Sequence, residues 1–554
     1  MIVLTGAETL LVNGKIFQAS GVAGKDQQAT FASSLLIGAD GTIRHIGFGD
    51  NDEVIQAARA NGSKVHDLQG QTVLPGFFDG HLHLLLLGLS LKKVDLAPCK
   101  DLSDIRRTIK EYAQAHPDVP RIMCKSWMHS MTPDGVDHSM LDDLDPRPIF
   151  VDTKDLHGTW CNQVAIDELD RDCGIGAMSN PPGGTIHRDS EGKLTGLLEE
   201  AVVFTIIWPY IARIATLEER AAAMEAAIET YNTAGYVGLI DMAMDQDSWD
   251  SLLFLKARRP DLPMHIAAYW LIRPADEADC LKQVDHVIEM ATKYSATTSP
   301  DLKIVGIKIV CDGIVDACTA ALSEPYTHTG STTEPVWTKP MLLPVVRKAD
   351  QAGLQVALHA IGDLTAHNAI DTIEECVSPE RRPRIEHLEL TSAEDAARLG
   401  RLGITASVQA VHADPAILRA WPRFIGEHRC GRAFAYREFA DGGAPIALGT
   451  DAPTAPQSLP ANCYVATTRR SAREPEYQAV VNGHFALGLC ESVVAGTEGS
   501  ARSCFMEHVT GRLEKGMNAD FAVLDMAWDK NELLRAKVTQ TWFAGRQVFD
   551  AGER

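Results

Sequence analysis

Short apolar runs alternate with amphipathic helical patterns along most of the chain from about residue 215. Such runs, bounded by turn residues, are typical of buried strands. Helical patterns separate most of them, for example at 217–234 and 391–402. Together with a run at 72–83, the candidate strands lie at 236–241, 265–270, 304–309, 355–359, 384–387, 405–409 and 446–451. Eight strands that alternate with helices predict an α/β fold, a (β/α)8 TIM barrel.

The two ends of the chain have a different pattern, in which short strands are separated by turns. At the N-terminal end the strands lie at 9–12, 34–38 and 42–47, and Asn13-Gly14 is a hairpin signal. At the other end they lie at 520–525 and 538–543. Each piece is too small for a strong core of its own. We therefore expect residues 1–70 and 501–554 to form one composite β-sandwich domain, with a barrel domain at 71–500 inserted between them.

The first βα unit of this barrel is unusually long. About 130 residues separate His83 from the helical pattern at 217, and they include strand-like runs at 121–127 and 148–151. A connection of this length is usually functional or a small subdomain. We expect an inserted subdomain at about 95–210 to lie over the C-terminal mouth of the barrel, where the active sites of such barrels form.

Charge and cysteine content narrow the class of protein. The 554 residues contain 52 Lys and Arg against 74 Asp and Glu, a net charge of -22. This balance argues against nucleic acid or an anionic membrane surface as a partner. The N-terminus shows no targeting pattern, and no apolar run is long enough to span a bilayer. The twelve Cys are dispersed, as expected for reduced thiols in a cytoplasmic protein.

Polar residues mark the carboxyl ends of several candidate strands. Alternate residues of a strand point to the same side, so a His-x-His pair at a strand end would present two imidazoles together. Imidazole and carboxylate groups are suitable ligands for Zn²⁺ and similar cations. One histidine on an apolar strand is more often a core residue, but a set of them at one mouth indicates a metal site. The candidate ligands are His81, His83, Lys308, His359, His387 and Asp451.

Lys308 is the unusual member of this set, because a lysine inside an apolar strand is costly unless it is paired. One interpretation is carboxylation by CO2, which would turn the amine into a carbamate anion able to bridge two cations. The other is a neutral or ion-paired lysine, for which Asp312 is a candidate partner.

The order of these residues along the chain resembles that of the amidohydrolase superfamily in its two-metal form. The segments around them resemble its third family, in the branch that contains N-substituted formamide deformylases. The segments that carry the resemblance are LPGFFDGHLH at 74–83, HAIGD at 359–363, RIEH at 384–387, LGTDAP at 448–453 and LEKGMNADF at 513–521.

The resemblance implies a metal-dependent hydrolase that acts on a carbon–nitrogen bond, an amide, through a metal-activated hydroxide. His81, His83 and Asp451 would hold one divalent cation, and His359 and His387 a second. Carboxylated Lys308 would bridge the two, and Asp451 would serve as base and then acid. Zinc is the first expectation for the metal, with Mn, Fe or Ni as alternatives. The candidate substrate contacts are Trp127, His157, Glu200, His412 and Arg437.

Two other functions compete with this one. The same site could act on an ester, a lactone or a cyclic amidine, or catalyse decarboxylation, because a fold does not fix a function. A binding protein that has lost catalysis is the alternative from another class. It is disfavoured because every expected ligand is present. In each case we expect a small-molecule ligand and a homo-oligomer, a dimer.

Overall fold

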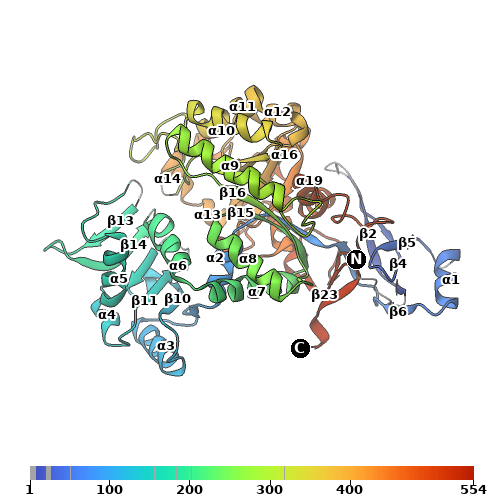
Figure 1. The fold of residues 1–554 in the computed structure, drawn as a ribbon, viewed down its shortest axis with the longest axis horizontal. Coiled ribbons are helices and arrows are strands. Elements are labelled where there is room, and N and C mark those ends of the chain that lie inside the picture. Colours follow the sequence, from blue (N-terminus) through green and yellow to red (C-terminus); the bar gives the residue numbers. More distant parts are fainter. Residues whose placement is uncertain are drawn as a thin grey trace. The chain divides into compact units, whose positions relative to one another are not determined.

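Eight parallel strands form the central sheet of the computed structural model. Each of these strands pairs with the sheet strands that come before and after it along the chain. This order confirms the predicted (β/α)8 barrel. Figure 1 labels two of the eight strands, β15 and β16. After β21 the sheet meets its first strand: the Asp451 amide donates to the His81 carbonyl at 2.7 Å, and the His83 amide donates to the Ala452 carbonyl at 2.9 Å. The strands are β8 (Phe77–Leu82), β15 (Tyr236–Met244), β16 (His265–Leu271), β17 (Leu302–Val310), β18 (Gln355–Ala360), β19 (Arg384–His387), β20 (Thr405–Val408) and β21 (Ile446–Leu448).

The structure describes residues 8–19, 27–49, 51–154, 158–181, 184–200, 202–316 and 318–553. They fall into two compact units. The first comprises residues 1–83, 228–245 and 260–554, and contains the barrel sheet and the terminal strands. The second comprises residues 84–227 and 246–259.

Helices alternate with the barrel strands along the chain, as the periodicity predicts. The predicted helix at 217–234 is α7, and the one at 391–402 is α12, which begins after Ser392 caps it by accepting a hydrogen bond from the Asp395 amide. Among the described residues, no helix is both long and apolar enough to cross a membrane. The helices are α7 (Leu217–Thr233), α8 (Gln246–Arg258), α9 (Glu277–Lys293), α10 (Lys339–Gln351), α11 (Asp363–Cys376), α12 (Ala393–Arg401), α16 (Tyr436–Asp441) and α17 (Leu459–Thr468).

The prediction of one strand over residues 72–83 is wrong, because the chain forms two separate strands there. The chain forms β7 (Thr72–Pro75), which belongs to a terminal sheet, and then β8, which opens the barrel. Gly76 lies between the two strands, where the chain passes from one sheet to the other. A side chain there would be too close to Val237, because a Cβ would lie 2.3 Å from Val237 Cγ2. Hydrophobicity alone cannot reveal this break, because both strands are fully buried.

Two sheets form the composite β-sandwich, and strands from both ends of the chain combine in the larger one. The four-stranded sheet has the order β5-β4-β1-β6 and the six-stranded sheet the order β24-β23-β22-β7-β2-β3. A common core includes Leu11 and Leu35 of the first sheet and Val73 and Phe521 of the second. The strands are β1 (Thr9–Val12), β2 (Lys15–Gln18), β3 (Thr30–Ala32), β4 (Ser34–Ile37), β5 (Ile43–Gly47), β6 (Lys64–Asp67), β22 (Phe521–Asp525), β23 (Lys537–Phe543) and β24 (Arg546–Asp550).

The hairpin predicted at Asn13-Gly14 does not form. The turn exists, and Asn13 adopts a φ of 57°. However, β1 pairs with β4 and β6, whereas β2 pairs with β3 and β7. The turn therefore joins the two sheets of the sandwich instead of two neighbouring strands.

The second unit is a six-stranded sheet with helices, built mostly from the segment that follows β8. Its strand order is β13-β14-β12-β11-β10-β9. The predicted strands at 121–127 and 148–151 are β10 and β11. The elements of this unit include α2 (Leu84–Leu91), β9 (Val94–Asp95), α3 (Leu102–Ala115), β10 (Ile122–Trp127), α4 (Ser139–Asp142), β11 (Ile149–Thr153), β12 (Gly158–Cys161), α5 (Gln163–Cys173), β13 (Gly184–Arg188), β14 (Leu194–Glu200) and α6 (Trp208–Ile214).

Candidate metal centre

Three predicted ligands converge at the carboxyl ends of the barrel strands. His81 lies near the end of β8, His387 ends β19, and Asp451 follows β21. One ligand atom from each of these residues lies within 4.8 Å of the others. All three are buried, with 1% of His81, 5% of His387 and 7% of Asp451 exposed. The barrel thus brings together donors that lie up to 370 positions apart in the chain.

Two further predicted ligands lie beside this group. His83 Nε2 is 3.0 Å from Asp451 Oδ1. The His359 ring, on β18, lies 4.4 Å from the His387 ring, measured between centroids. The histidines and the aspartate of the predicted set therefore form one continuous cluster at the mouth.

Lys308, on β17, completes the predicted set. Its side chain is buried, and its Nζ has no hydrogen-bond partner among the described residues. Burial lowers the pKa of Lys308, although the nearby Glu386 and Asp451 carboxylates oppose this effect. An amine in this state is more readily neutral and nucleophilic, as reaction with CO2 requires.

A buried carboxylate orients His81. His81 Nδ1 is 2.7 Å from Glu386 Oε2, and because an ionised carboxylate only accepts, Nδ1 carries the hydrogen and Nε2 presents a lone pair. Arg384 holds Glu386 in turn, with its Nε 2.9 Å from Oε1. Burial favours the protonated acid, but Arg384 and His81 hold the pKa of Glu386 well below its usual range. Burial, together with the nearby Lys308, lowers the pKa of His81 to about 4.

A second carboxylate orients His359. Asp312 Oδ1 accepts from His359 Nδ1 at 3.1 Å, and Asp312 also accepts from the amides of Ile361 and Gly362. The alternative partnership of Asp312 with Lys308 is therefore wrong, because this carboxylate is committed to His359 and to the backbone after β18. Neither Glu386 nor Asp312 was among the predicted site residues, although both lie within four residues of one in the sequence.

Asp79 fixes the loop that carries Asp451. Its carboxylate accepts from the Thr450 amide at 3.0 Å, from the Thr450 hydroxyl at 2.6 Å and from the Tyr231 hydroxyl at 2.9 Å. Asp79 is fully buried, and burial raises its pKa to about 6 despite these bonds. This network holds the strand ends of β8 and β21 together directly below the ligands.

The donor set fits a divalent cation. His387 Nδ1 and Lys308 Nζ are buried without a hydrogen-bond partner in the part of the chain that the structure describes. Burial and the neighbouring His359, His81 and Lys308 hold the pKa of His387 well below its usual range, so its imidazole is neutral with a lone pair to offer. Neutral imidazoles beside an ionised carboxylate are the donors that zinc and related ions take.

His412 and Glu389 extend the cluster on one side. His412 Nδ1 is 3.5 Å from Glu389 Oε1, and His412 Nε2 is 3.8 Å from Asp451 Oδ2. Burial raises the pKa of Glu389. Burial disfavours the charged form of His412, but Glu389 and Asp451 outweigh it and raise the pKa of His412. His412 was a predicted substrate contact, and the structure brings it beside the predicted metal ligand Asp451.

The other predicted substrate contacts have varied positions. Trp127 is fully buried in the core of the second unit, where its indole donates to the Thr132 hydroxyl at 3.2 Å. Arg437 forms two hydrogen bonds with Glu491, at 2.7 and 2.9 Å. His157 lies outside the described residues, and Glu200 lies at the end of β14.

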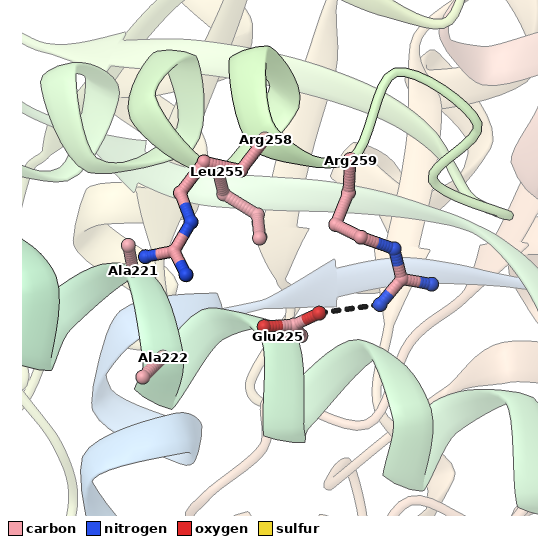
Figure 2. Close-up of a pocket in the computed structure, with 6 residues that line it drawn as sticks. All are labelled: Ala221, Ala222, Glu225, Leu255, Arg258 and Arg259. Carbon is pink, nitrogen blue, oxygen red and sulfur yellow. Dashed lines mark hydrogen bonds and ion pairs between the residues drawn. The ribbon is translucent and has the colours of Figure 1, made fainter.

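A hollow elsewhere in the protein has a different character. Figure 2 shows it between α7 and α8, within the second unit. It contains no histidine or cysteine, and Arg259 in its wall pairs with Glu225. Its chemistry does not match that of the strand-end cluster. The hollow is lined by Ala221, Ala222, Glu225, Leu255, Arg258 and Arg259.

Comparison with known proteins agrees with the fold. Putative amidohydrolase YtcJ of Bacillus subtilis is 27% identical over 531 residues, which cover 92% of this chain and 95% of that protein. N-substituted formamide deformylase of Arthrobacter pascens is 24% identical over 571 residues, covering 94% and 95% respectively. The crystal structure of an uncharacterised metal-dependent hydrolase from Pyrococcus furiosus has a TM-score of 0.75 and 25% identity, and it covers 94% of this chain and 99% of that one. The sequence model of the amidohydrolase family matches residues 64–549, and the chain therefore belongs to that family.

Proposed function

We propose that the protein is a metal-dependent amidohydrolase that cleaves an amide-type carbon–nitrogen bond of a small molecule. The observation that carries this proposal is the convergence of His81, His387 and Asp451 within 4.8 Å, buried at the mouth of the barrel. The similarity to N-substituted formamide deformylase supports an amide as the substrate class.

The residues fall into two groups of ligands under this proposal. His81, His83 and Asp451 would hold one cation, and His359 and His387 would hold a second. Lys308, carboxylated at Nζ, would lie between them; its buried amine without a partner among the described residues supports this role. Bound divalent cations supply Lewis-acid polarisation of a carbonyl oxygen and lower the pKa of water towards about 7. Zinc is the first candidate, because imidazole nitrogen and carboxylate oxygen suit it.

Asp451 is the residue that moves the proton. Burial favours its protonated form, but His83, His81 and His412 lower its pKa, so the carboxylate is ionised and able to accept. Water adds to the carbonyl carbon, Asp451 takes the proton that water loses, and it returns that proton to the leaving nitrogen as the C–N bond breaks. The products are a carboxylic acid and an amine, so atoms and charge balance.

The oriented histidines reduce the cost of assembling this site. Glu386 and Asp312 fix the rings of His81 and His359 before any ligand binds. Partners of this kind set the tautomer and raise the basicity of the coordinating nitrogen. The substrate contacts proposed from the sequence, His157, Glu200 and His412, would then decide which amide is accepted.

A substrate panel tests this function. Purified protein would be assayed as isolated, after removal of metal with a chelator, and after reconstitution with Zn²⁺ or Mn²⁺. The panel would contain N-substituted formamides, larger amides, and the matched esters and lactones. We expect amide hydrolysis that disappears with the metal and returns with it. Amide turnover that survives complete metal removal, or turnover of esters alone, would contradict the proposal.

A further inference from the structure

The side-chain amide of Gln409 is buried at the mouth of the barrel without a hydrogen-bond partner. Gln409 directly follows β20, and 1% of it is exposed. Neither its Nε2 nor its Oε1 bonds with any group among the described residues. A buried polar group that stays unpaired destabilises a fold, so native proteins pair nearly all of them. The amide of Gln409 therefore points to a role outside folding.

The backbone directs this amide towards the barrel interior. Gln409 is extended, with φ -118° and ψ 94°, so its side chain lies on the same face of the chain as that of Ser407. Ser407 Oγ accepts from Arg384 Nη2 at 2.8 Å, and Arg384 holds Glu386 beside His81. Gln409 thus shares the face that carries the residues of the metal centre.

The strand before Gln409 lies between the strands that carry two candidate ligands. The sheet order places β20 between β19, which ends in His387, and β21, which precedes Asp451. The Gly449 amide donates to the Val408 carbonyl at 2.9 Å, and the chain reaches Asp451 two residues after Gly449. A side chain at this position and on this face lies at the level of the ligand cluster.

The backbone of Gln409 is fixed, although its amide is unpaired. Its carbonyl accepts from the His412 amide at 3.0 Å and from the Tyr436 hydroxyl at 3.2 Å. A polar group on a rigid support is what a binding site needs to orient a ligand. The amide itself can still turn about its last bond, because the preferences of that torsion are broad.

A second buried glutamine of the same sheet has no such freedom. Gln355, the first residue of β18, is also 1% exposed. Its Oε1 accepts from the Tyr269 hydroxyl, and its Nε2 donates to the carbonyls of Arg382 and Ser503. Gln355 is a structural residue with both ends of its amide paired. Gln409 differs from it in this respect alone, so the two residues form a matched pair for experiment.

We propose that Gln409 is a substrate-binding residue, whose Nε2 donates to the carbonyl oxygen of the scissile amide and whose Oε1 accepts from its nitrogen. A carboxamide is suited to this task because it supplies both a donor and an acceptor. The inference rests on the proposed function and deepens it, since an ester offers the oxygen but no N–H group. Gln409 would therefore favour amides over esters.

The two hydrogen bonds would form together only as the reaction proceeds. A planar trans amide directs its C=O and N–H groups to opposite sides, so one carboxamide can bond with only one of them. When water adds and the carbon becomes tetrahedral, the C–N bond can rotate and both groups can turn towards Gln409. An interaction that is complete only in the transition state raises kcat more than it lowers KM.

The competing explanation is a structural glutamine whose amide is hydrated inside the barrel. Its replacement would then alter the turnover of amides and esters by the same factor. The two explanations differ in the ratio of amide to ester turnover, because only the proposed role gives the N–H group of the substrate a partner. This ratio also cancels the higher intrinsic reactivity of esters when a variant is compared with the parent.

The test compares the zinc-loaded parent with Gln409→Met and Gln409→Leu, which replace the amide by an apolar side chain of similar size. Gln355→Met is the matched control. The substrates are the amide of the panel with the highest turnover and its matched ester, for example N-butylformamide and butyl formate. Steady-state kinetics would give kcat and KM, elemental analysis the zinc content, and thermal unfolding the stability.

We expect kcat/KM of both Gln409 variants to fall by about 10- to 100-fold for the amide, mainly through kcat, and by about 3- to 10-fold for the ester. Zinc content should equal that of the parent, and the unfolding temperature should not fall, because no hydrogen bond within the described residues is lost. Gln355→Met should unfold at a lower temperature and keep the parent ratio of amide to ester turnover.

An unchanged ratio in the Gln409 variants, through equal losses or no loss, would overturn the inference. If the parent hydrolyses the amide in that case, the proposed function stands and only this role of Gln409 fails. A zinc-loaded parent that hydrolyses no amide would overturn the proposed function, and this inference with it.

Discussion

Two buried histidines of the barrel, His81 and His265, have different roles. His81 belongs to the candidate metal centre, whereas His265 stabilises the fold. His81 lies at the carboxyl end of β8, and His265 is the first residue of β16, at the opposite end of the barrel. Each is 1% exposed and contacts a buried carboxylate. His265 Nδ1 is 3.0 Å from Asp301 and its Nε2 is 3.0 Å from Asp520, so both of its nitrogens are satisfied.

The two histidines differ in their charge and in whether a ring nitrogen keeps a free lone pair. Burial disfavours a charged ring at both places, but the two carboxylates raise the pKa of His265 to about 9, whereas the pKa of His81 falls to about 4. A charged His265 joins the barrel to Asp520, which precedes β22 of the terminal sheet. A neutral His81 keeps a lone pair for a cation. Function at the mouth therefore follows from polar groups that the protein leaves incompletely paired.

Removing the proton acceptor at the mouth should have the largest effect. Asp451→Asn preserves size and one oxygen but cannot carry a proton between water and the leaving nitrogen. We expect kcat to fall by about 10²–10⁴ while some metal is retained. Steady-state kinetics paired with elemental analysis would measure both quantities. A near-normal kcat would give Asp451 a purely structural role, like that of Asp520 beside His265.

Replacing Lys308 should lower both the metal occupancy and the catalytic rate. Lys308→Ala removes the proposed bridge but should leave the fold intact, because the variant loses no hydrogen bond among the described residues. We expect loss of activity and lower metal occupancy, with partial recovery when short-chain carboxylic acids are added as carbamate substitutes. Activity close to that of the parent would rule out the bridge and favour a mononuclear site.

At the opposite end of the barrel, the stabilising contribution of His265 should depend on pH. The folded pKa of His265, about 9, lies above the usual unfolded value of about 6.5. Its stabilising contribution is therefore complete below pH 6.5 and is lost as the pH rises through 9, at most about 3 kcal/mol. The unfolding temperature of the parent should approach that of His265→Asn between these values. A constant gap between the two proteins across that range would contradict the charged state of His265.

The inserted segment should have the smallest and most selective effects. We propose that His157→Ala and Glu200→Ala change kcat/KM by different factors for different amides and leave metal content unchanged. Pockets take their specificity from a few placed polar groups, whereas the ligands are fixed at strand ends. Equal losses across a panel of amides would instead indicate a shared catalytic role. No loss for any amide would place this segment away from the substrate.

Much of this site could be predicted because strand ends leave a clear signal in the sequence. An apolar run that closes on a histidine or aspartate identifies both a buried strand and a polar group at one end of it. The parallel barrel then brings such ends together, as happens for His81, His387 and Asp451. The predicted order of the eight strands is confirmed for the same reason.

The partners of these residues could not be predicted. Glu386 and Asp312 are acidic residues beside a ligand in the chain, but nothing local says which histidine each will face. Glu386 orients His81, which lies 305 residues away, instead of its neighbour His387. The break between β7 and β8 could not be predicted because the apolar run continues from one strand into the next, and both strands are fully buried. Side-chain pairing depends on contacts across the fold, which periodicity along one segment does not report.

Metal content tests the central claim most directly. Full-length protein, grown with added zinc or manganese and then desalted, would be measured by elemental analysis, with His81→Asn as the matched loss and His265→Asn as the matched control. The account predicts about two divalent cations per chain in the parent, a clear loss in His81→Asn and no loss in His265→Asn. A parent protein that holds no metal, or equal metal in all three proteins, would contradict it.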